Sequence, residues 1–155
     1  MKKLISTLTL GLLLATGTAH AQLADKKALT IAEAKKALAA SVAEAQKNNW
    51  NVVIAVVDDG GHLVALERMD KAQKASIDIA IGKAKAASMF RRPSAALEEA
   101  IAKGRNALLS VEGYALMQGG MPIVVNGEVI GAIGVSGVQS TQDEQIAKAG
   151  TDTIK

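Results

Sequence analysis

An unbroken run of apolar, mostly β-branched residues is the feature that most limits how this chain can fold. It spans Val52–Val57 and has no polar position. Such a run is typical of a strand that is buried on both faces of a sheet. The Asp58–Gly61 stretch that follows favours a hairpin turn, because glycine tolerates positive φ. We therefore expect His62–Arg68 to return as the partner strand, with the side chains of His62 and Arg68 on the same face.

A second hairpin is predicted in the C-terminal third of the chain. Asn126-Gly127 is the strongest two-residue turn signal in the sequence, and it separates Met121–Val125 from Glu128–Ser136. The stretch Asn106–Gln118 is ambiguous. It is compatible with a helix, a loop or a short strand near Tyr114–Met117.

Helices are expected before, between and after the two hairpins. Thr30 and Glu33 form a capping box at the start of a helix that ends at Asn48-Asn49. Further helix starts are expected at Ser76, at Ser94 and at a second capping box made by Thr141 and Glu144. The pattern predicts one α/β (α+β) domain with an antiparallel sheet between helices.

The N-terminus has the features of a secretory signal peptide. Lys2 and Lys3 precede the apolar run Leu4–Leu14, and Ala19-His20-Ala21 has the small-x-small pattern of a cleavage site. We expect residues 1–21 to be removed and residues 22–155 to form a single domain in the periplasm or outside the cell. The run is too short to span a membrane, which takes about 20 residues.

Charge and composition exclude several classes of function. The chain has 18 basic and 15 acidic residues, and removing the signal with its two lysines leaves 16 against 15, a net charge of +1. A nearly neutral surface argues against a nucleic-acid partner. The absence of cysteine excludes thiolate nucleophiles and iron–sulfur clusters. His62 would be the only histidine of the mature chain, which rules out a zinc site with several histidines.

Three groups of motifs occur together in an order that resembles a known family. They are Val56–Val64 with Arg68-Met69-Asp70, then Ala80–Ala84, then Gly119–Ile123 with Gly131–Gly137 and Gln142-Asp143-Glu144. The stretch from Leu29 to the C-terminus is similar to the GlcG/HbpS family, also called the haem-degrading or PduO C-terminal-like domain. This resemblance implies a profilin-like fold, a five-stranded antiparallel sheet between helical layers. It also implies haem binding, haem degradation in some members, and assembly as a homo-oligomer.

His62 is the principal candidate ligand for a metal or haem iron, because a neutral imidazole is a common axial ligand. The alternative is a solvated histidine in a turn. If His62 is not the ligand, the other candidates are Met69, Met89, Met117 and Met121 through their thioethers and Tyr114 through its phenolate. Each of these side chains is more often a packing residue.

The remaining candidates for cofactor binding are polar or lack a side chain. Arg68, Arg91 and Arg92 can pair with haem propionates, although Arg91-Arg92 also suits a solvated helix end. Lys83 can bind a carboxylate, and Gly119 and Gly120 permit close approach to the backbone. Iron-ligand or acid–base roles are considered for four acidic residues, with turn and helix-end roles as alternatives: Asp58, Asp70, Asp143 and Glu144.

Two classes of function follow from these residues. The first is an exported protein that binds haem, a related tetrapyrrole or its iron, for storage, delivery or redox sensing. The second is a small-molecule enzyme or accessory factor for a carboxylated metabolite, whose pocket would be lined by His62, Arg68, Asp70 and Lys83. An oligomeric scaffold without a ligand is a third possibility, because the alanine-rich helix faces permit close packing.

Overall fold

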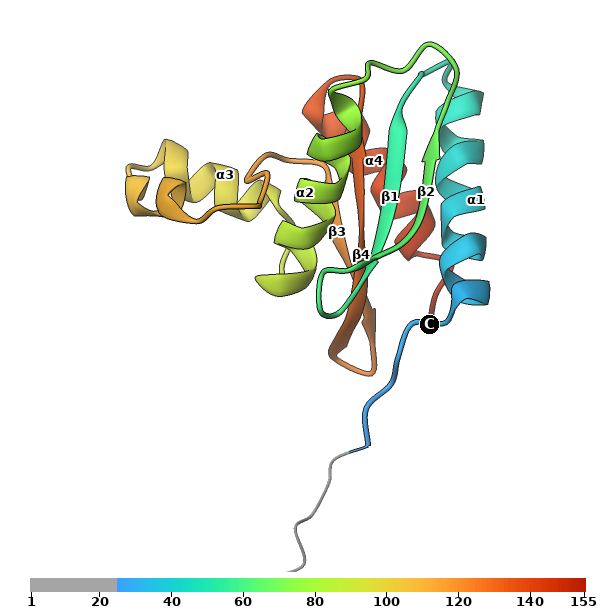
Figure 1. The fold of residues 1–155 in the computed structure, drawn as a ribbon, viewed down its shortest axis with the longest axis horizontal. Helices are drawn as coiled ribbons and strands as arrows, with labels where there is room; N and C mark the ends of the chain where they lie inside the picture. Colours follow the sequence, from blue (N-terminus) through green and yellow to red (C-terminus); the bar gives the residue numbers. More distant parts are fainter. Residues whose placement is uncertain (1–24) are drawn as a thin grey trace, which may run out of the picture.

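The computed structural model describes residues 25–155 (Figure 1). The expected signal peptide, residues 1–21, lies outside this described part. The helices and strands, in chain order, are α1 (Ile31–Lys47), β1 (Val53–Asp58), β2 (Leu63–Arg68), α2 (Ser76–Met89), α3 (Ala95–Ala102), the 3-10 helix η1 (Asn106–Ser110), β3 (Gly120–Val125), β4 (Glu128–Ser136) and α4 (Ser140–Thr151). No helix of residues 25–155 is both long and apolar enough to cross a bilayer.

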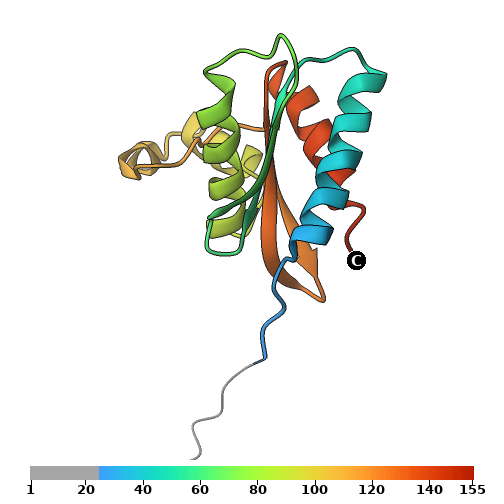
Figure 2. The ribbon, with the colours of Figure 1, turned by 45° about the vertical axis from the view of Figure 1, so that its right-hand side comes forward.

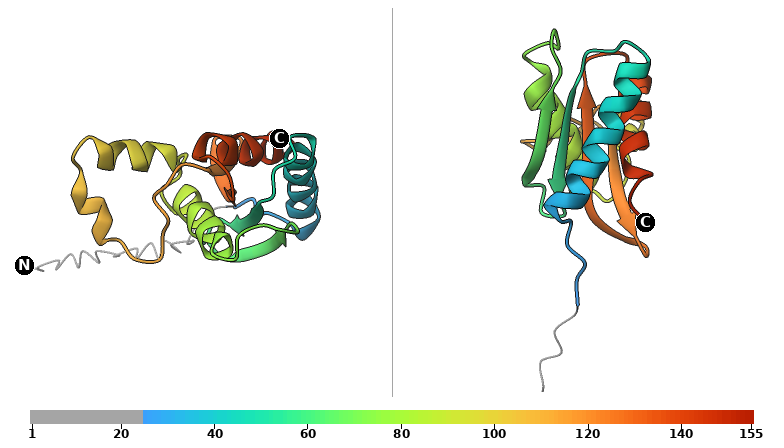
Figure 3. Two further views of the ribbon diagram at one scale, coloured as in Figure 1. Left: turned by 90° about the horizontal axis from the view of Figure 1, so that it is seen from above. Right: turned by 90° about the vertical axis from the view of Figure 1, so that its right-hand side faces the viewer.

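The sheet has the order β2-β1-β4-β3, and every neighbouring pair is antiparallel. Helices α1 and α4 cover one face, and α2 covers the other (Figures 2 and 3). Strand β1 lies in the middle and is buried on both faces, as its apolar run predicted. The α/β class and the helical layers on both sides are therefore confirmed.

Both predicted hairpins are present. Asn126 and Gly127 have φ values of 53° and 82°, which are the two positive angles of a type I′ turn. In the first hairpin, Asp58 Oδ1 accepts hydrogen bonds from the N–H groups of Gly60 and His62 over 2.9 and 2.8 Å. Two roles were considered for Asp58, and the structure shows one of them: its side chain accepts hydrogen bonds within the turn.

The described residues form four strands, so the expectation of five is wrong for this part of the chain. Residues 111–118, which contain the candidate fifth strand, run as an irregular segment. Its backbone groups bond to side chains of the neighbouring helix: Ser94 Oγ donates to the carbonyl of Met117, and the Glu98 carboxylate accepts from Gln118 N–H. These two bonds hold the end of the segment beside α3, and Ala115 lies against Gly82 of α2, so the segment crosses α2 instead of adding to the sheet.

The helix starts agree with the sequence in part. Thr30 Oγ1 accepts from Glu33 N–H over 3.2 Å, so the predicted cap of α1 is present. The box that opens α4 is formed by Gln139 and Gln142, where the Gln142 side chain accepts from Gln139 N–H over 3.2 Å. The expected box of Thr141 and Glu144 is therefore wrong by two residues, because the helix begins earlier, at Ser140.

Small residues bring α2 unusually close to β4. A Cβ atom added at Gly134 would collide with the carbonyl of Ala80 and with the amide of Ala84. Both are backbone groups of α2 and cannot turn aside as a flexible side chain can. The bare backbone of Gly134 therefore sets the distance between the helix and the sheet.

We expect Gly134→Ala to lower the free energy of unfolding by about 3 kcal/mol or more, because overpacking against rigid backbone is at the upper end of the usual range. Gly104→Ala is the matched control. Gly104 has φ +96° and no atom within 4 Å of an added Cβ. Gly104→Ala therefore measures only the cost of placing a residue with a side chain at positive φ, about 1 kcal/mol. Urea denaturation measures both values. Equal losses would contradict the close packing described for α2.

Candidate functional site

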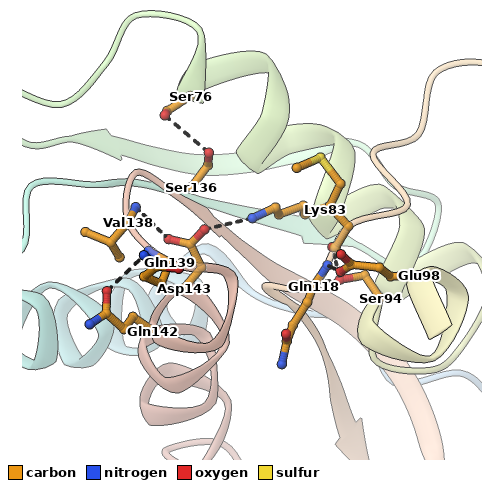
Figure 4. A network of polar contacts seen from close by, with 12 residues as sticks. Ser76, Lys83, Ser94, Glu98, Gln118, Ser136, Val138, Gln139, Gln142 and Asp143 are labelled. Atoms are coloured by element: carbon orange, nitrogen blue, oxygen red, sulfur yellow. Dashed lines mark hydrogen bonds and ion pairs between the residues drawn. The ribbon is translucent and has the colours of Figure 1, made fainter. Parts of the chain in front are cut away.

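A buried ion pair joins the two helical layers at the edge of the sheet (Figure 4). Lys83 belongs to α2 and Asp143 to α4, which lie on opposite faces. The Lys83 amine donates to Asp143 Oδ2 over 2.8 Å, and the two side chains are only 2% and 3% exposed. Lys83 therefore already binds a carboxylate, and that carboxylate belongs to the protein itself.

Gly119 and Gly120 make room for this pair where strand β3 begins. Gly119 has φ +124°, and a Cβ added there would lie 2.8 Å from Lys83 Nζ and 2.9 Å from Asp143 Cβ. A Cβ at Gly120 would collide with the Lys83 carbonyl. The two glycines do permit a close approach, as predicted, and the group that approaches them is Lys83.

The surroundings of Asp143 have opposing effects on the pKa of its carboxyl group. Burial raises the pKa of the Asp143 carboxyl above its ordinary value, while the hydrogen bond and charge of Lys83 and the N–H of Val138 act to lower it. The second carboxylate oxygen, Oδ1, accepts from Val138 N–H over 3.2 Å. Both oxygens thus have protein partners, and the pair is well suited to hold the start of α4 in place.

A hollow of about 200 Å³ lies at the other side of α2, beside the first hairpin turn. It is lined by Gly60, Gly61, His62, Lys85, Met89, Glu112, Gly113 and Tyr114. The His62 ring lies over Gly60, since a Cβ added there would be 3.0 Å from its Cδ2 and 3.3 Å from its Nε2. The side chains of Lys85 and Met89 lie over Gly61, since a Cβ added there would be 3.5 Å from Lys85 Cγ and 3.4 Å from Met89 Cγ.

A second hollow of about 390 Å³ continues along the outer surface of α2. It is lined by Asp78, Ile79, Ile81, Gly82, Lys85, Gly113, Tyr114 and Ala115. Lys85, Gly113 and Tyr114 line both hollows, so the two adjoin. We call them together the α2 groove. Small-molecule sites usually measure roughly 300–1,000 Å³, so the first hollow is small on its own and the groove as a whole is not.

Residues from three parts of the chain form the α2 groove. Lys85 and Met89 lie one turn apart on α2, and His62 comes from the turn between β1 and β2. Residues 112–115 form the opposite wall, and Ala115 packs directly on Gly82. An imidazole, a thioether, a phenol and an ammonium group therefore face one space.

The apolar surface of this groove is partly open to solvent. Met89 is 47% exposed. The Tyr114 ring is held from behind by Phe90, with ring centroids 5.4 Å apart and an edge-to-face angle of 76°. The groove thus offers one flexible apolar side chain and one supported aromatic ring to a ligand.

The structure places the predicted site residues in separate regions. His62 lines the α2 groove, whereas Lys83, Gly119 and Gly120 surround the buried pair. Arg68 ends β2, six residues from His62 and about 20 Å along the strand at 3.3 Å per residue. Asp70 follows Arg68 and is exposed. The four residues expected to line one metabolite pocket therefore lie in separate places, and of these four His62 alone lines the α2 groove.

The alternative candidates are also dispersed. Met89 and Tyr114 line the groove with His62; Met69 and Met121 pack against the core between the sheet and α1 and α4; and Met117, Arg91 and Arg92 are exposed elsewhere. Within residues 25–155, no three histidine, aspartate or glutamate side chains come together as a metal site. The role of His62 as a ligand of a metal or haem iron stays a prediction.

Lys85, Glu112 and Gly113 did not stand out in the sequence as site residues. Lys85 and Met89 are four residues apart, which places them on one side of a helix and could have been noticed. Glu112 and Gly113 could not, because their position depends on how the irregular segment 111–118 crosses α2.

Breaking the buried pair should be costly. We expect Lys83→Met to lower the free energy of unfolding by about 3–5 kcal/mol, because it leaves the Asp143 charge buried without its partner. The double substitution of Lys83→Met with Asp143→Leu removes both charges and should recover most of that loss. Urea denaturation of both variants measures the difference. A double variant as unstable as the single one would show that the pair does more than neutralise its own charges.

Comparison with known proteins gives a consistent result. The family model described as "Haem degrading protein HbpS-like" matches residues 29–152. Protein GlcG of Escherichia coli is 48% identical over 99 residues, which are 64% of this chain and 74% of the relative. A double mutant of HbpS from Streptomyces reticuli has a TM-score of 0.82 at 31% identity, covering 90% of this chain and 95% of that one. A PduOC–haem complex has a TM-score of 0.75 at 26% identity, covering 83% and 96%. The chain therefore belongs to the HbpS-like family.

Proposed function

We propose that this protein binds haem, a related tetrapyrrole or its iron in the α2 groove. The observation that carries the proposal is that His62, the one histidine of the described residues, lines this groove beside an exposed thioether and a supported tyrosine ring. The structure of the PduOC–haem complex, which is similar over 83% of this chain, supports haem as the ligand.

The residues of the groove fit a haem in three respects. The His62 imidazole is exposed and free of side-chain hydrogen bonds within residues 25–155, so it is available as an axial ligand. Met89 and Tyr114 offer apolar and aromatic contact to a flat macrocycle. Lys85 offers a cation for a propionate.

A bound haem would supply ligand binding and redox chemistry at its iron. The protein would supply the imidazole of His62, held in place by the turn in which Asp58 binds the N–H groups of Gly60 and His62. The groove is open on its outer side, so it would shield one side of the macrocycle and leave the rest accessible. This arrangement suits uptake and release of a ligand better than permanent enclosure.

We further infer that the role is storage, delivery or redox sensing outside the cytoplasm. The predicted signal peptide, residues 1–21, supports export, and the family resemblance supports a homo-oligomeric state and a profilin-like class for the fold. Acquisition of haem after export would match an open groove, because the cofactor then enters a protein that has already folded.

A haemin titration followed by Soret absorbance tests the proposal. We expect saturable binding of one haem per chain, and we expect His62→Ala to shift the Soret band and weaken binding about tenfold or more, about 1.4 kcal/mol. The physical reason is loss of the axial ligand. Saturable binding with an unchanged spectrum in His62→Ala would move the ligand to another side chain.

Two methionines provide a matched control for the location of the site. Met89 and Met117 are 47% and 45% exposed, but only Met89 lines the α2 groove. We expect Met89→Ala to weaken haemin binding several-fold and Met117→Ala to leave it unchanged. Equal effects would contradict a site in this groove.

Absence of saturable haemin binding by the unaltered protein would instead favour the second candidate, an enzyme or accessory factor for a carboxylated metabolite.

A further inference from the structure

We propose that Lys85 is the specificity-determining residue of the α2 groove, and that it selects tetrapyrroles with free carboxylates over uncharged ones. The inference rests on the proposed function and deepens it, because it assigns the chemical class of ligand to one side chain. Arginines were the candidates for this role in the sequence, and the structure gives it to a lysine.

Lys85 lies where the two hollows of the groove adjoin. Lys85 is the one charged residue that lines both hollows of the groove. Its Cγ lies 3.5 Å from the point that a Cβ of Gly61 would occupy, so the aliphatic stem rests on the bare turn of the first hairpin. A long stem supported in this way keeps the ammonium group near the junction of the hollows.

Lys85 has no ion-pair partner within residues 25–155. Six lysines form ion pairs within 4.0 Å in the described part of the chain: Lys26, Lys36, Lys47, Lys83, Lys103 and Lys148. Lys85 forms none there, although it is partly buried. Without an anion of the protein to pair with, the ammonium group of Lys85 is available to a ligand carboxylate.

Each hollow of the groove also has one acidic residue in its lining. Asp78 lines the far hollow and Glu112 the hollow beside His62. Carboxylates of a ligand are repelled by these two groups and attracted only to the ammonium group between them. Lys85 thus fixes the position of the acid groups along α2, and with it the orientation of the macrocycle toward His62.

The test compares haemin with haemin dimethyl ester, whose two propionates are uncharged. We expect the unaltered protein to bind haemin at least about tenfold more tightly than the ester. Lys85→Ala should abolish this preference by weakening haemin binding alone, and Lys85→Arg should retain it, because both cations pair with carboxylates. Lys74→Ala, at an exposed position outside the groove, is the matched control and should change neither value.

The outcomes separate this inference from the proposed function. A preference for haemin that survives in Lys85→Ala, or an unaltered protein that binds both compounds equally, would overturn the role of Lys85 and leave haem binding in place. Binding of neither compound would overturn the proposed function and the inference with it. Thermal unfolding of each variant confirms that the altered chains are folded, and raised salt should reduce the preference only where Lys85 or Arg is present.

Discussion

The ion pair between Lys83 and Asp143 is the interaction on which the arrangement of this protein depends. It joins helices on opposite faces of the sheet, and it passes the sheet at the bare backbone of Gly119 and Gly120. The two side chains are 2% and 3% exposed, and each charge stabilises the other, because burying either one alone would be strongly unfavourable. The pair therefore fixes α2 against the sheet and the start of α4 against its edge, and Gly134 lets α2 come close enough to reach it.

This constraint also positions the α2 groove. Successive residues of a helix are about 100° apart, so Lys83 and Lys85 point to different sides of α2. The first lysine is turned inward and neutralised by Asp143, and the second is turned outward into the groove without an ion-pair partner among residues 25–155. A helix that is anchored on its inner side presents Lys85 and Met89 on a fixed surface, which is where a binding site benefits from rigidity.

Local chemistry explains which parts of the structure could be predicted from the sequence. The doubly buried strand β1 and the Asn126-Gly127 turn follow from short-range patterns, and both are present. The number of strands did not follow, because the segment 111–118 is held at its end by bonds from Met117 and Gln118 to Ser94 and Glu98, a long-range arrangement that no local pattern encodes. For the same reason only part of the groove could be predicted from the sequence. His62 stands out as a lone histidine, whereas the role of Lys85 depends on how the segment 111–118 crosses α2.

Binding of haem in the α2 groove, as proposed, would leave the buried pair of Lys83 and Asp143 untouched. Amide chemical shifts of the ¹⁵N-labelled protein, recorded with and without diamagnetic gallium protoporphyrin, test it most directly. We expect the largest changes on residues 60–62, on Lys85 and Met89, and on residues 112–115, with little change at Gly119, Gly120 and Asp143. Changes centred instead on the hollow lined by Lys27, Lys36 and Lys155, or on the buried pair, would contradict it.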